Sequence, residues 1–115
     1  MALRVYNVIK RGYLDECILL AGKNGLNREI KLVSVVELPN AYLWCKGGEL
    51  LLTALYSIKN NEEAQINLLE NVNKNGAAAM ILFNYESCFD NISVKFIDRA
   101  NDLAFPIFKA PSDLT

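Results

Sequence analysis

The second half of the chain alternates between strand-length apolar runs and helical patterns, and this alternation constrains the fold most. Three apolar runs, 49–55, 78–83 and 105–109, are separated by two segments with helical spacing, 60–75 and 92–103. A strand–helix–strand unit joins two parallel strands, and its crossover is almost always right-handed. The chain is therefore predicted to be a single α/β domain, with a mainly parallel sheet and both helices packed on it.

Both helical segments carry boundary and packing signals. Asn60 is placed as an N-cap, Glu63 three residues later completes a capping-box pattern, and Gly76 stands where a C-terminal glycine is expected. Leu51 in the first strand and Leu68 in the first helix are predicted core residues. The apolar positions at helical spacing predict one buried stripe per helix: Ala64, Leu68 and Val72 in the first, and Ile92, Phe96, Ile97, Ala100 and Leu103 in the second.

The first half of the chain is predicted to hold a short helix and two strands. Val5, Val8 and Ile9 have the i, i+3, i+4 spacing of an amphipathic helix. Residues 17–21 and 30–37 are apolar runs on either side of an Asn-Gly turn signal. A hairpin-like pairing of these two strands is one arrangement that this spacing allows.

Length, charge and composition narrow the function classes. The chain has 115 residues, the length of one domain, and its 12 Lys and Arg against 13 Asp and Glu give a net charge of −1. This balance disfavours a nucleic-acid surface, which needs a clustered excess of Lys and Arg. The sequence contains no His, the commonest general base and metal ligand. We therefore predict no enzymatic activity, no cofactor and no metal site.

The cysteines and the hydrophobic pattern indicate the cellular setting. Cys17, Cys45 and Cys88 form no CxxC pair and no even-numbered disulfide framework. Cys45 lies beside Lys46, whose charge could lower the thiol pKa, but without His no Cys–His pair exists, so a nucleophilic role is disfavoured. No apolar run approaches the roughly 20 residues of a membrane span, and no signal-peptide pattern is present. A cytoplasmic chain without membrane contact is expected.

Polar and aromatic residues near the ends of two predicted strands form the candidate site. Ligands of open α/β sheets gather at the carboxyl ends of strands, where Glu37 and Thr53 are expected. Trp44 could anchor a partner or plug the core. The polar side chains could equally satisfy nearby backbone groups or face solvent. The candidate ligand- or partner-binding residues are Ser34, Glu37, Trp44, Gly47, Gly48, Glu49 and Thr53.

The Gly47-Gly48 pair comes immediately before a predicted strand. A phosphate cradle normally follows a strand and opens a helix, so this order favours a structural turn over a phosphate site. Glycine also allows a ligand to approach the backbone closely, which leaves the second interpretation open. We expect residues 37–39, the Trp44 loop and residues 47–49 to come together and form the functional surface.

Six segments carry a pattern that extends over essentially the whole chain. They are Leu20-Ala21-Gly22, Gly25-Leu26-Asn27-Arg28-Glu29-Ile30, Val36-Glu37-Leu38-Pro39, Leu43-Trp44, Gly47-Gly48-Glu49-Leu50-Leu51-Leu52-Thr53 and Phe105-Pro106-Ile107. In order and spacing, the chain resembles the N-terminal domain of purine-catabolism-regulator-like (PucR-type) bacterial transcription factors. The Glu-Leu-Pro and Gly-Gly-Glu-Leu-Leu-Leu-Thr segments are the most specific parts of the resemblance.

The resemblance implies that residues 1–115 are one regulatory domain, excised from a longer transcription factor that binds DNA through a C-terminal helix-turn-helix. Such a domain would sense a small-molecule effector, a metabolite of purine catabolism or nitrogen metabolism, or mediate self-association or contact with other domains of the regulator. The strand order also resembles, at fold level, the small N-terminal domain of Mur-type ligases. A nucleotide-binding accessory domain of such an enzyme is therefore the alternative.

Overall fold

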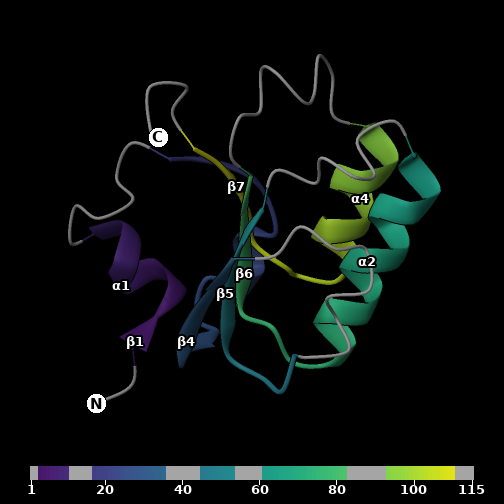
Figure 1. Ribbon diagram of the computed structural model, residues 1–115. Coiled ribbons are helices and arrows are strands. Elements are labelled where there is room, and N and C mark those ends of the chain that lie inside the picture. The colour runs from purple at the N-terminus through teal and green to yellow at the C-terminus, as the bar shows by residue number, and fades with distance from the viewer. Residues whose placement is uncertain (1–2, 11–16, 36–44, 54–60, 83–92, 111–115) are drawn as a thin grey trace.

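A five-stranded sheet with the order β2-β7-β6-β5-β4 organises the chain (Figure 1). The computed structural model describes residues 3–10, 17–35, 45–53, 61–82 and 93–110. The sheet strands are β2 (Ile18–Ala21), β4 (Leu32–Val35), β5 (Glu49–Thr53), β6 (Ala79–Leu82) and β7 (Ile107–Lys109). The other elements are β1 (Leu3–Arg4), α1 (Val5–Lys10), η1 (Lys23–Gly25), β3 (Glu29–Ile30), α2 (Glu62–Lys74) and α4 (Val94–Asp102).

The predicted parallel sheet is confirmed. β4, β5, β6 and β7 run parallel, with Leu51 opposite Met80 and Met80 opposite Ile107. α2 connects β5 to β6 and α4 connects β6 to β7, as expected of two strand–helix–strand units. The four strands therefore end at the same edge of the sheet.

The hairpin-like pairing between the first two predicted strands is wrong. β2 instead pairs antiparallel with β7, where Leu19 lies opposite Phe108, and β4 pairs with β5 at the other edge of the sheet. After β2, the Gly22 amide donates to Asn101 Oδ1 at 2.8 Å, a contact 79 residues apart in sequence. This long-range contact holds the end of β2 against α4. The Asn-Gly turn signal is local and could not predict it.

Helices α2 and α4 cover one face of the sheet, and α1 lies against the other (Figure 1). Leu51 packs under the two long helices, and its strand neighbour Leu50 packs with Val5 of α1 on the opposite face. Leu51 and Leu68 are 0% and 4% exposed, as predicted for core residues. The central strand β6 is apolar and buried along its whole length because both faces of the sheet are covered there.

The ends of α2 follow two capping rules, one of them at a different residue from the predicted one. The N-cap is Asn61, whose Oδ1 accepts from the Ala64 amide at 2.9 Å; Asn60 lies outside the described residues. The third helical position is therefore Ala64, so the predicted capping box with Glu63 does not form. At the other end, Gly76 is in the left-handed region at φ 91°, as expected for a C-terminal glycine.

The inner stripe of α4 is largely as predicted. Phe96 and Ala100 are fully buried, Ile97 and Leu103 pack at the margin of the same core, and Ile92 lies outside the described residues. Within the described part of the chain, no helix is long and apolar enough to cross a membrane.

Candidate functional site

The structure places the predicted site residues at both ends of the parallel strands. Some lie where the strands begin, and others lie where they end, at the carboxyl edge of the sheet. Gly47, Gly48 and Glu49 lie where β5 begins, and Thr53 lies where it ends. Ser34 lies in β4, opposite Leu51 in register. Glu37 and Trp44 lie outside the described residues, as does segment 37–39, so the predicted convergence with 47–49 stays a prediction.

The turn before β5 is held by the side chain of Glu49. The residue is 4% exposed, and its carboxylate accepts hydrogen bonds from the backbone amides of Lys46 at 2.6 Å and Gly47 at 3.0 Å. Such amides could bind an anion, but here the anion is the carboxylate of the chain itself. The contacts give Glu49 a structural role at this turn.

Gly48 fixes the turn to its neighbours on both sides. Its amide donates to the carbonyl of Gly76 at 2.8 Å, and its own carbonyl accepts from the Lys31 amide at 2.8 Å. Its φ is 82°, and a Cβ atom would meet the Lys31 side chain at 2.7 Å. A side chain at residue 48 is thus disfavoured by both conformation and space.

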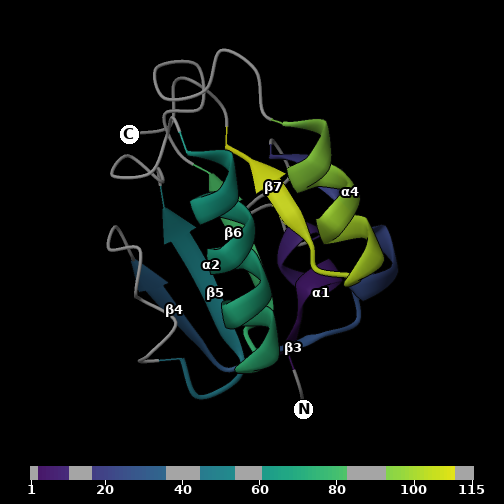
Figure 2. The ribbon, with the colours of Figure 1, turned by 90° about the vertical axis from the view of Figure 1, so that its right-hand side faces the viewer.

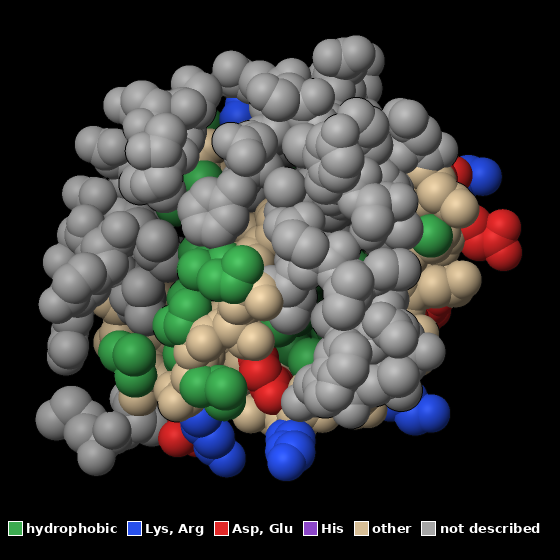
Figure 3. All heavy atoms as spheres, in the orientation of Figure 1, with side chains coloured by type: hydrophobic (Ala, Val, Ile, Leu, Met, Phe, Trp, Pro, Cys, Tyr) green, Lys and Arg blue, Asp and Glu red, His purple; other side chains and the backbone are tan. Residues whose placement is uncertain are grey.

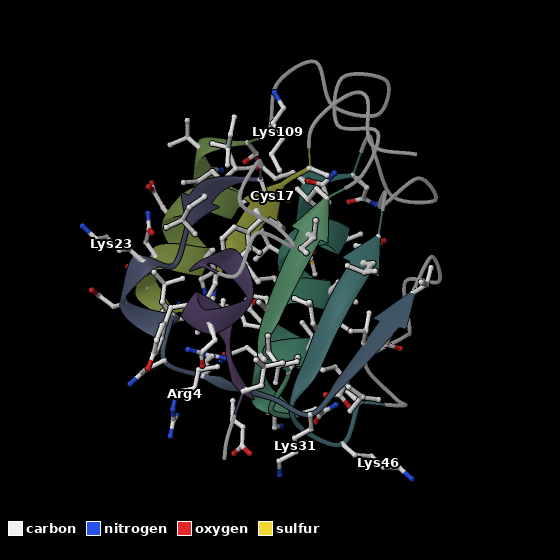
Figure 4. The ribbon with its side chains drawn as sticks, turned by 90° about the vertical axis from the view of Figure 1, so that its left-hand side faces the viewer. Arg4, Cys17, Lys23, Lys31, Lys46 and Lys109 are labelled. Carbon is white, nitrogen blue, oxygen red and sulfur yellow. The ribbon has the colours of Figure 1, made fainter. Side chains whose placement is uncertain are left out.

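Cys45 lies next to this turn and has the opposite electrostatic character from the one that Lys46 suggested. Burial raises the pKa of the Cys45 thiol, and the negative charge of Glu49 raises this pKa further. A raised pKa keeps the thiol protonated, whereas nucleophilic cysteines are thiolates. Figure 4 shows the side chain of Lys46 pointing outward from the end of the sheet where β4 and β5 begin.

The carboxyl edge of the sheet carries the other candidate residues. Val35, Thr53 and Lys109 end their strands at this edge, and Figure 4 shows Lys109 at the opposite end of the molecule from Lys31 and Lys46. Thr53 is 1% exposed, and Ser34 is half-buried. The segments that follow these four parallel strands, 36–44, 54–60, 83–92 and 111–115, lie outside the described residues.

Arg28 is a residue to which the sequence patterns assigned no role. Its Nη1 donates to the Ala77 carbonyl at 3.0 Å, and its Nη2 donates to Asn73 Oδ1 at 2.7 Å and to the Leu103 carbonyl at 2.9 Å. The guanidinium also lies 5.2 Å from the centre of the Phe105 ring. One side chain thereby binds the C-terminal ends of both α2 and α4, where free carbonyls and the helix dipole favour a cation.

Burial lowers the pKa of the Arg28 guanidinium, but an arginine keeps its charge at neutral pH. The position of Arg28 depends on close packing by Gly25, three residues before it. A Cβ atom at Gly25 would lie 1.8 Å from the carbonyl oxygen of Ala104. The Gly-Leu-Asn-Arg-Glu-Ile segment is thus a structural joint between the first half of the chain and the ends of both helices.

Within the described residues, the side chains form no group of three or more His, Cys, Asp or Glu that could hold a metal ion. The labelled lysines in Figure 4 point outward, away from one another. The described geometry therefore consists of a turn closed by its own carboxylate, an arginine joint, and a carboxyl edge with two hydroxyl side chains.

Comparison of the sequence with known proteins identifies its family. Residues 7–115 match the model of the Purine catabolism regulatory protein-like family (PucR). The chain is 26% identical over 112 residues to the Purine catabolism regulatory protein of Bacillus subtilis (strain 168), covering 97% of this chain and 21% of that relative. The chain thus spans about a fifth of the relative's length. The chain belongs to the Purine catabolism regulatory protein-like family.

Proposed function

We propose that this chain is the effector-responsive regulatory domain of a cytoplasmic transcription regulator, without catalytic activity of its own. The observation that carries the proposal is the family match over residues 7–115, together with a relative named as a purine catabolism regulatory protein. We infer that DNA binding belongs to other parts of such a regulator, because the net charge of −1 offers this chain no excess of cations for phosphates.

The proposed effector is a small metabolite of purine breakdown or of related nitrogen metabolism. We place its site at the carboxyl edge of the sheet, with Ser34 and Thr53 among the described residues and Glu37 and Trp44 among the others. Parallel sheets bind ligands at this edge, and a pocket needs a few polar groups among apolar ones. The turn at Gly47 to Glu49 supports the first residues of β5 in this proposal and does not contact the effector.

The contacts of that turn argue against the nucleotide-binding alternative at the Gly47-Gly48 pair. The backbone amides of Lys46 and Gly47 already donate to the Glu49 carboxylate. A nucleotide phosphate would have to displace a buried, hydrogen-bonded charge, which is costly.

A thermal-shift screen with purines, ureides and nucleotides tests the proposal. A ligand that binds only the native state stabilises it by about 2.7 kcal/mol at a hundredfold excess over Kd. For a domain of this size the gain raises Tm by on the order of 10 °C. Thr53→Val should reduce the shift, while Lys23→Ala, at an exposed residue of η1, should keep it. No shift with any compound at millimolar concentration would overturn the proposal.

A further inference from the structure

The edge strand β4 exposes apolar residues beside an open row of backbone groups. β4 is the last strand of the sheet, and in the described part of the chain no strand lies on its outer side. Val33 and Val35 are 59% and 74% exposed. Figure 2 shows α2 in front of β5 and β6, whereas β4 lies to the left of α2 as the outermost strand. Figure 3 shows hydrophobic side chains gathered on the face over β4.

The two outermost strands of the sheet, β2 and β4, differ in how they resist pairing with another strand. Natural edge strands are protected by charges, prolines or bulges. At the β2 edge, the register shifts between Leu19 and Ala21, so a bulge distorts the strand. β4 has a regular register over all four residues and contains neither a charged residue nor a proline. Only the β4 edge thus lacks these protections among the described strands.

The direction of the backbone groups of β4 follows from its pairing with β5. The Leu32 amide points to the Gly48 carbonyl at 3.4 Å, on the β5 side. Alternate residues of a parallel strand address the same neighbour, so Ser34 also faces β5 and the amide and carbonyl groups of Val33 and Val35 point outward. The register also puts the Val33 and Val35 side chains on one face of the sheet, beside Leu50 and Leu52.

We propose that β4 pairs antiparallel with β4 of a second copy of this chain, about a two-fold axis at Ser34. This pairing places Val33 of each copy opposite Val35 of the other, and these two pairs exchange the outward-pointing backbone hydrogen bonds. The two Ser34 side chains then face each other in the pair without backbone hydrogen bonds, where side chains lie closest. The result is a continuous ten-stranded sheet.

A second copy fits this edge because β4 is complementary to itself. Residues opposite each other in a sheet must lie on the same face, so the two-fold axis has to pass through a residue. With the axis at Ser34, β-branched residues meet β-branched residues on one face and hydroxyls meet on the other, both favourable cross-strand pairs. An axis at Val33 would instead place Lys31 opposite Val35 and Leu32 opposite Ser34.

This inference gives a specific form to the self-association that the family resemblance implies, and it rests on the proposed role of the chain as a regulatory domain. A four-residue strand pair is a small interface, so we expect weak association of the 115-residue chain, with Kd on the order of 100 µM. Sedimentation velocity from about 10 to 500 µM should show a monomer–dimer equilibrium. A chain that stays monomeric over this range overturns the inference. If an effector still raises the Tm of that monomer, the proposed function stands.

Two lysine variants with matched exposure test the location of the interface. Val35→Lys puts a charge on the β4 edge and should weaken dimerisation roughly tenfold or more. Val94→Lys makes the same substitution at a residue of α4 with 73% exposure and should leave the dimer unchanged. Equal effects of the two variants would overturn the assignment to β4. Circular dichroism checks that both variants remain folded.

A cysteine variant tests the register. Ser34→Cys should form a disulfide between two copies under oxidising conditions, because directly opposed residues in this pair have Cα atoms about 4.5 Å apart, within disulfide range. Wild type and Val94→Cys measure the background from the native cysteines. Mass spectrometry should identify a peptide linked through residue 34 in both copies. A dimer that yields no such peptide overturns the pairing about Ser34.

Discussion

Replacing Arg28 by alanine should destabilise the domain more than any other surface-reaching substitution that we describe. The change removes three hydrogen bonds, to the carbonyls of Ala77 and Leu103 and to Asn73, and the contact with the Phe105 ring. A hydrogen bond from a charged donor contributes about 1.5–3 kcal/mol when buried, and a cation–π contact about 0.5–1 kcal/mol. Because Arg28 is half-buried and its contacts act as one unit, we expect a loss of about 3–5 kcal/mol in the free energy of unfolding.

Urea denaturation followed by circular dichroism measures this loss, with an unchanged m-value as the sign that the unfolding reaction is the same. Arg28→Lys keeps the charge but loses the planar fork that binds several acceptors, so it should retain only part of the stability and lose about 2 kcal/mol. Arg4→Ala is the control, because Arg4 is near the surface and donates to the Asn27 carbonyl at 2.6 Å. This control should cost about 0.5 kcal/mol or less. A loss below about 1 kcal/mol for Arg28→Ala, or one equal to the control, would refute the reasoning.

Three further predictions concern the buried core, the backbone at Ala104 and the Cys45 thiol. Leu51→Ala and Leu68→Ala should each lower the free energy of unfolding by about 2–5 kcal/mol, measured by the same denaturation, since both side chains are buried; a change near zero would contradict their place in the core. Ala104 has a φ of 51°, so Ala104→Gly should relieve left-handed strain and raise stability by up to about 1 kcal/mol, whereas a clear loss would contradict the strain. Because burial and Glu49 raise the pKa of Cys45, iodoacetamide should label this thiol at pH 8 more slowly than an unfolded control peptide, and the rate should rise only at higher pH; equal rates would contradict the raised pKa.

The elements between residues 49 and 109 could be predicted from the sequence because their signals are local. Each apolar run, helix cap and C-terminal glycine can be recognised from a few neighbouring residues. The parallel order of the strands follows from the handedness of the crossovers. The predicted N-cap of α2 differs from the observed one by one residue because Asn60 and Asn61 are both residues that cap helices well. Only the hydrogen bond that Asn61 accepts from the Ala64 amide identifies the cap.

The pairing of β2 and the role of Arg28 could not be predicted because both depend on distant partners. The acceptors of Arg28 lie 45 to 75 residues further along the chain. The composition of the chain does not predict that Arg28 joins the two helix ends. The free carbonyls at those ends imply only that some donor must satisfy them. The hydrogen bonds that Glu49 accepts from the amides two and three residues before it were likewise not predicted, and its role as a ligand residue stays a prediction.

An NMR titration of the 115-residue chain tests the central claim, that an effector binds at the carboxyl edge of the sheet. The titrant is the compound that gives the largest Tm rise among purines, ureides and nucleotides, and the readout is the backbone amide signals. The account predicts that the signals of Thr53 and Leu82, at the carboxyl edge, shift in a saturable way, while those of Lys46 and Gly47, at the opposite edge, stay in place. Shifts confined to Lys46 and Gly47, or no saturable shift with any of these compounds, would contradict it.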